Sequence, residues 1–140
     1  MADPTTPNCL DSFVDTNVVV YAFGRTDAGT PSARALSECG AQLDVQVLNE
    51  FVNVASRKLR MPWGDIHDAL RIIRIFAGPI HPLTSAVHEA GVAIAERYRY
   101  HIYDALIIAA AAEAGCRTLY SEDLAAGQTI KGVRIVDPFV

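Results

Sequence analysis

Four acidic residues stand where the chain is expected to leave a strand or to begin the helix that follows it. Asp15 comes directly after a short β-branched run, and Asp104 lies in the first turn of an alanine-rich helical segment. Because the carboxyl ends of parallel strands meet at one edge of a sheet, side chains at such positions can converge. The full set is Asp15, Glu50, Asp104 and Asp123.

Such a cluster has a defined chemistry. Neighbouring carboxylates raise one another's pKa, and a divalent cation relieves that repulsion. Oxygen ligands without a histidine or thiolate partner favour Mg²⁺ or Mn²⁺. One or two of these ions can activate a water and clamp a phosphodiester for in-line attack. The four acids therefore predict a metal-dependent phosphodiester hydrolase.

Each acid alone also has a simpler explanation. Asp104 could be an acid that favours a helix N-terminus, and Glu50 could be an ordinary surface glutamate. Asp123 could be a turn or cap residue. Asp15 is harder to explain in this way, since it adjoins an apolar run and a buried unpaired carboxylate is costly. It is the set of four that favours the catalytic interpretation.

The elements that must position these acids alternate along the chain, which predicts an α/β fold. We expect a central parallel β-sheet of about five strands, flanked by helices on both faces. Residues 1–10 form a predicted flexible tail, and residues 11–140 a single domain. The predicted strands are 12–15, 41–47, 80–83, 116–120 and 133–136. The predicted helices are 17–23, 31–39, 48–60, 63–76, 84–98 and 103–115, with Thr16 or Asn17 capping the first and a loop at 128–131.

The composition and net charge of the chain argue against several classes of protein. The 140 residues are 51% apolar and 20% charged, and the net charge is −4, which argues against binding nucleic acid through a broadly basic surface. The three cysteines show no CxxC pairing, which fits a reducing compartment better than a disulfide framework. We find neither a signal peptide nor an apolar run long enough to span a membrane. The sequence therefore predicts a cytoplasmic protein.

Four short motifs, in order along the chain, resemble those of the PIN-domain nucleases, and within them the VapC-type toxins of bacterial toxin–antitoxin systems. Serine in the last motif stands where threonine is often found, which keeps the hydroxyl. The motifs are Val14-Asp15-Thr16-Asn17-Val18, Val47-Leu48-Asn49-Glu50-Phe51, Tyr103-Asp104-Ala105-Leu106-Ile107 and Leu119-Tyr120-Ser121-Glu122-Asp123-Leu124.

This resemblance implies a PIN-like fold and a Mg²⁺-dependent endoribonuclease, with Mn²⁺ as the other candidate ion. The four acids would ligate the metal directly or through water. Asn17, Ser121 and Thr16 would hydrogen-bond the acids or the metal's waters. The implied substrate is tRNA, rRNA or mRNA. The implied partners are a small VapB-type antitoxin and a second copy of the chain in a homodimer, with no membrane.

Other interpretations stay open at this point. Arg25, Arg97 and Arg99 are candidate RNA-binding residues, although solvated surface is the better explanation for them. A non-catalytic PIN-like module that binds RNA or a partner is one alternative function. A phosphatase-like phosphotransferase with Asp15 as its nucleophile is another, but that chemistry usually needs an acid two positions later, where this chain has Asn17.

Overall fold

The computed structural model describes residues 11–24, 31, 33–35 and 40–139. The predicted tail 1–10, Arg25 and most of the predicted helix 31–39 lie outside these residues. The strands are β1 (Ser12–Val14), β2 (Leu43–Asp44), β3 (Ile80–His81), β4 (Thr118–Tyr120), β5 (Thr129–Ile130) and β6 (Val133–Val136). The helices are α1 (Thr16–Phe23), α3 (Val45–Arg57), α4 (Trp63–Phe76), α5 (Ser85–Tyr98) and α6 (Ile102–Glu113).

The strands form a mostly parallel sheet. One part has the order β1-β4-β6-β5, in which β1 pairs with β4 and β4 with β6 in parallel. The other part is the parallel pair β2-β3. A parallel bridge between Phe13 and Gln42 joins the two parts beside β1. The α/β prediction with a central parallel sheet is therefore confirmed, and the sheet places the ends of β1, β2 and β4 along one edge.

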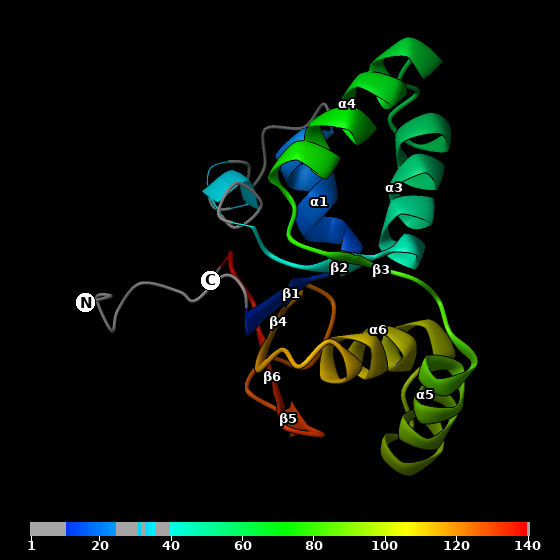
Figure 1. Ribbon diagram of the computed structural model, residues 1–140, viewed down its shortest axis with the longest axis vertical. Helices are drawn as coiled ribbons and strands as arrows, with labels where there is room; N and C mark the ends of the chain where they lie inside the picture. The colour runs from blue at the N-terminus through cyan, green and yellow to red at the C-terminus, as the bar shows by residue number, and fades with distance from the viewer. Residues whose placement is uncertain (1–10, 25–30, 32, 36–39, 140) are drawn as a thin grey trace.

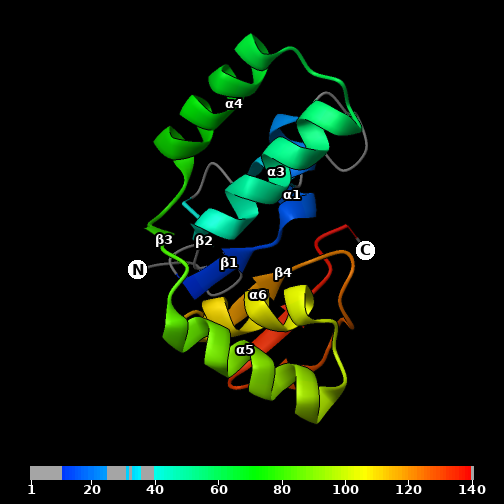
Figure 2. The same ribbon diagram turned by 90° about the vertical axis from the view of Figure 1, so that its right-hand side faces the viewer.

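Helices cover both faces of this sheet. In Figures 1 and 2, α1, α3 and α4 lie together on one side of the strands, and α5 and α6 lie together on the other. The pair α5–α6 is closely packed, because a Cβ added at Gly91 of α5 would lie 2.6 Å from Cδ2 of Leu106 in α6. None of the described helices is both long enough and apolar enough to cross a bilayer.

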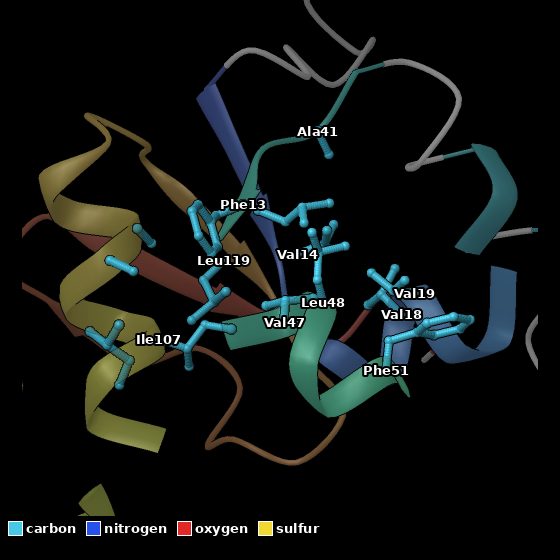
Figure 3. Close-up of a cluster of buried hydrophobic side chains, with 14 of the residues drawn as sticks. Phe13, Val14, Val18, Val19, Ala41, Val47, Leu48, Phe51, Ile107 and Leu119 are labelled. Carbon is cyan, nitrogen blue, oxygen red and sulfur yellow. The ribbon is translucent and has the colours of Figure 1, made fainter. Parts of the chain in front are cut away.

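The hydrophobic core sits directly behind the acidic strand ends. Figure 3 shows Phe13 and Val14 of β1 in one cluster with side chains from α1, α3 and α6. Phe13 and Phe51 are fully buried, and Val14 is 1% exposed. Because protein interiors are close-packed, this cluster fixes the backbone on which Asp15 and Glu50 are mounted.

The prediction of a strand over 41–47 is wrong after residue 44. The loose alternation of Leu43, Val45 and Val47 favours a strand over 41–47, but α3 already begins at Val45. Asp44 is the N-cap of that helix, and its carboxylate accepts a 2.9 Å hydrogen bond from the Val47 backbone N–H. An N-cap aspartate of this kind satisfies an otherwise unpaired donor and so begins the helix three residues earlier than predicted.

The predicted loop 128–131 is also wrong, since it contains β5. This strand runs antiparallel to β6, and Ile130 pairs with Val133. The two residues between them, Lys131 and Gly132, both have positive φ, at 53° and 78°. This is the backbone of a type I′ hairpin turn, which usually carries Asn-Gly or Asp-Gly and was not recognised in a Lys-Gly pair.

Candidate active site

Five carboxylates line one pocket at the carboxyl edge of the parallel strands. The pocket has a volume of about 100 Å³, and no lysine, arginine or histidine is among the described residues that line it. Its acids come from the ends of β1 and β2, the second turn of α3, the first turn of α6, and the segment after β4. They are Asp15, Asp44, Glu50, Asp104 and Asp123. The structure thus brings all four predicted acids together and adds Asp44.

Asp15 is the most constrained of these acids. It is the N-cap of α1, and its Oδ1 accepts a 2.7 Å hydrogen bond from the Thr16 N–H. The expectation that Thr16 or Asn17 would cap this helix is therefore wrong. The other oxygen, Oδ2, accepts a 2.8 Å hydrogen bond from the Ser121 hydroxyl. Both carboxylate oxygens are held, and the side chain is only 8% exposed.

Three polar side chains connect the acids to one another. Ser121 is fully buried and both donates to Asp15 and accepts a 3.2 Å hydrogen bond from the Asp123 N–H. The Thr16 hydroxyl donates to Oε2 of Glu50 at 2.5 Å. Nδ2 of Asn17 donates to Oδ2 of Asp123 at 3.1 Å. These contacts place Asn17, Ser121 and Thr16 beside the acids, where the sequence predicted them.

Burial and mutual repulsion perturb the acids. Burial raises the pKa of Asp15 from 3.8 to about 6, against the lowering effect of its hydrogen bonds from Ser121 and Thr16. The charges of Glu50 and Asp123 raise it further. A carboxylate whose two hydrogen bonds do not offset its desolvation is expensive to ionise. The pocket therefore holds negative charge that the protein alone does not fully compensate.

Asp44 and Asp104 also have raised pKa values. Burial raises the pKa of both, and the charge of Glu50 raises the pKa of both further. Asp104 also feels the charge of Asp123. Perturbed carboxylates gathered in one cleft are typical of functional sites, although structural networks can produce them too.

The pocket offers oxygen atoms, which are the ligands that a hydrated divalent cation such as Mg²⁺ prefers. Oδ1 of Asn17 is buried and has no hydrogen-bond partner among the described residues, which leaves an oxygen unsatisfied beside the acids. No three His, Cys, Asp or Glu side chains within the described ranges are arranged so that they could hold a metal ion together. Mg²⁺ usually keeps several waters and contacts only one or two carboxylates, so an all-oxygen pocket of this kind suits it without a three-carboxylate cage.

Two of the predicted RNA-binding arginines, Arg97 and Arg99, are described by the structure, and neither lines this pocket. Arg97 and Arg99 are exposed at the end of α5, where the Arg97 guanidinium lies 5.5 Å from the ring centroid of Tyr98. Arg99 is the left-handed residue, with φ of 59°, that ends the helix. Tyr103, by contrast, lines the pocket and is 57% exposed, so its ring is not a core side chain.

Asp44 is the acid that the sequence interpretation missed. It was placed inside a strand, but it is an aspartate directly before an apolar-periodic helix, which is itself an N-cap signal. Gln46 was also missed, and its Nε2 donates to Oε1 of Glu50 at 3.2 Å. Extending the helical period of α3 back to Val45 would have identified both residues.

The Ser121 hydroxyl gives a test of how the site is held. We expect Ser121→Ala to lower the free energy of unfolding by about 1–3 kcal/mol at pH 7, because Asp15 and the Asp123 N–H both lose a buried partner. Chemical denaturation measures this change. Ser121→Thr, which keeps the hydroxyl, is the control and should lose much less. Equal losses in the two variants would show that packing, and not the hydroxyl, matters here.

Comparison with known proteins agrees with this architecture. The crystal structure of Mycobacterium tuberculosis VapC20, described as a Sarcin-Ricin loop cleaving toxin, is similar with a TM-score of 0.66 and 21% identity, over 80% of this chain and 89% of that one. A toxin–antitoxin complex from Klebsiella pneumoniae is similar with a TM-score of 0.68 and 22% identity, over 91% and 97%. No curated protein matches in a sequence search. The PIN domain family matches residues 12–129, and the chain therefore belongs to that family.

Proposed function

We propose that this protein is a metal-dependent endoribonuclease and the VapC-type toxin of a toxin–antitoxin pair. One observation carries the proposal. In a chain of the PIN family, five carboxylates line a single pocket at the carboxyl edge of the sheet, with no basic side chain among the described residues of its lining. Such a pocket attracts a divalent cation, and a divalent cation in turn attracts a phosphodiester.

Asp15, Asp104 and Asp123 would hold Mg²⁺ or Mn²⁺ directly or through water, and Glu50 would complete the set. When bound, the ion would polarise a phosphoryl oxygen and lower the pKa of a coordinated water. Thr16, Asn17 and Ser121 keep the other acids in position through the hydrogen bonds given above. Asp104 differs, because no described residue donates a hydrogen bond to its carboxylate. An oxygen of Asp104 is therefore available to accept a proton from the attacking water.

A partner protein is supported by the surface of α4. Four of its large apolar side chains are exposed, and one of them, Ile75, is 70% exposed. Ile72, Ile75 and Phe76 lie three and four positions apart near the end of the helix, and neighbouring exposed apolar side chains of this kind commonly mark protein interfaces. The Klebsiella pneumoniae neighbour is a toxin–antitoxin complex, and we propose that this chain also binds a small antitoxin. We further propose that it forms a homodimer. The four side chains are Trp63, Ile72, Ile75 and Phe76.

The alternative functions have less support. Asn17 has no acidic proton, and its amide donates to Asp123, so it does not serve as the general acid that a phosphatase with Asp15 as nucleophile would need. A module that only binds RNA or a partner does not need a carboxylate at Asp15, whose raised pKa lowers the free energy of unfolding at neutral pH.

RNA cleavage tests the proposal directly. Purified protein is incubated with total RNA in Mg²⁺, in Mn²⁺ and in EDTA, and the new RNA ends are sequenced. We expect discrete ends with either ion and none in EDTA. The same ends in EDTA would contradict metal dependence, and unchanged RNA with both ions would favour the binding module.

A further inference from the structure

A larger groove adjoins the acidic pocket on the side of α1 and α3. It has a volume of about 690 Å³ and is lined by these two helices and by the segment after β4. Figure 2 shows α1 and α3 lying side by side. The groove and the pocket share Thr16, Asn17, Glu50 and Asp123. The pocket and the groove are therefore neighbours, and these four residues form the boundary between them.

The lining of the groove differs from that of the pocket. Val20, Val54 and Leu59 give it a partly apolar wall, whereas Asn53 and Lys58 are exposed polar residues of the same helix end. Lys58 supplies an ammonium group to a surface that otherwise carries acids. Within the described part of the chain, no carboxylate forms an ion pair with Lys58.

We propose that this groove binds the nucleotide adjacent to the scissile phosphodiester, with the Lys58 ammonium on its backbone phosphate. The apolar wall suits the face of a base or a ribose, and the Asn53 amide can hydrogen-bond a base edge. The volume is ample for one nucleotide. This inference rests on the proposed nuclease function and adds to it a substrate-binding residue.

The Lys58 ammonium favours a backbone phosphate at its end of the groove, whereas Glu50, Glu122 and Asp123 make the rest of the lining acidic. A phosphodiester that reaches a pocket of five carboxylates is repelled wherever a bound cation does not screen it. The neighbouring phosphate lies beyond that cation, and so it gains from a lysine placed next to the pocket. Lys58 is the basic residue among those that line the groove.

Arg57 gives a matched control. It is the last residue of α3, Lys58 is the C-cap of the same helix, and both are exposed. Either cation favours the helix dipole equally well. Arg57, however, is not among the residues that line the groove or the pocket. If Lys58 only interacts with the dipole of α3, Lys58→Ala and Arg57→Ala should have equal effects on RNA binding. If Lys58 binds a phosphate, only Lys58→Ala should weaken RNA binding.

The experiment measures binding of a fluorescent single-stranded RNA of mixed sequence, by anisotropy, with Ca²⁺ in place of Mg²⁺ and over a range of salt concentrations. We expect Lys58→Ala to weaken binding about fivefold and to reduce the salt slope by about 0.7, because one phosphate contact is lost. Arg57→Ala should stay within about twofold. Lys58→Arg should recover most of the affinity.

Each other outcome is informative. Equal losses for Lys58→Ala and Arg57→Ala, or no loss for either, would overturn the groove assignment. Normal RNA binding by Lys58→Ala together with weaker binding of a co-expressed antitoxin would make the groove a protein site instead. A wild-type protein that binds RNA through Lys58 but cleaves none in Mg²⁺ would keep the groove and remove the nuclease function.

Discussion

Replacing Asp104 by Asn is expected to lower the rate of RNA cleavage about 10³-fold while leaving the fold intact. Asn is the same size as Asp, and no described residue donates a hydrogen bond to the Asp104 carboxylate, so the change breaks no contact of that kind. It removes both the negative charge and the oxygen that can accept a proton. Rates of cleavage of a defined RNA at saturating Mg²⁺ measure the effect.

The control for this variant is Glu113→Gln, which removes one charge from the opposite end of the same helix. It should cleave at the wild-type rate. Loss of growth inhibition on expression of Asp104→Asn, but not of Glu113→Gln, would give the same result in cells. Wild-type cleavage by Asp104→Asn would remove Asp104 from the site.

Asp15→Asn is expected to stabilise the metal-free protein above pH 7. Asp15 has a pKa of about 6 in the folded protein and 3.8 ordinarily, so the folded state holds its proton more tightly than the unfolded chain. The free energy of unfolding therefore falls as the pH rises from about 4 to 6 and stays low above that window. The gap corresponds to about 3 kcal/mol, at about 1.4 kcal/mol per pH unit.

Asn removes this electrostatic cost but keeps only one acceptor oxygen for the two donors, Thr16 N–H and the Ser121 hydroxyl. Losing one hydrogen bond costs about 1 kcal/mol. The net gain is then about 2 kcal/mol, or about 6 °C in melting temperature at pH 8 in EDTA. At pH 4 the gain should disappear, because wild-type Asp15 is then protonated as well.

Mg²⁺ should narrow this difference in stability. At ten times its dissociation constant it stabilises the wild-type protein by about 1.4 kcal/mol through mass action, and the variant by less because one anionic ligand is gone. Thermal melts of both proteins in EDTA and in Mg²⁺ provide the comparison. A metal-free variant less stable than wild type at pH 8, with neither protein responding to Mg²⁺, would mean that Asp15 is a structural cap only.

The sequence predicted those parts of the fold that depend on local patterns. Helix α4 has the predicted bounds Trp63–Phe76, and α5 begins within one residue of its predicted start at 84. The gathering of the four acids followed from one topological rule, that the ends of parallel strands share an edge. Because this rule needs only the order of the strands and helices, the prediction held although some predicted bounds were wrong by several residues.

Contacts between residues far apart in the sequence could not be predicted from local patterns. The contacts from Ser121 to Asp15 and from Asn17 to Asp123 each join residues 106 positions apart in sequence, and no local pattern specifies them. Arg97 and Arg99 precede Asp104 closely in sequence, but the left-handed turn at Arg99 separates α5 from α6 and keeps both arginines out of the pocket lining. The role proposed for Lys58 also depends on tertiary structure, because the groove that it lines forms where α1 packs against α3.

Mn²⁺ binding and RNA cleavage, titrated in one set of reactions, test the central claim most directly. Paramagnetic resonance reports free Mn²⁺, and a labelled RNA reports cleavage. The acidic pocket predicts that both rise with the same half-saturation in wild-type protein, and that Asp104→Asn weakens Mn²⁺ binding and abolishes cleavage together. Cleavage that reaches its full rate before Mn²⁺ binds, or Mn²⁺ binding unchanged in both Asp15→Asn and Asp104→Asn, would contradict it.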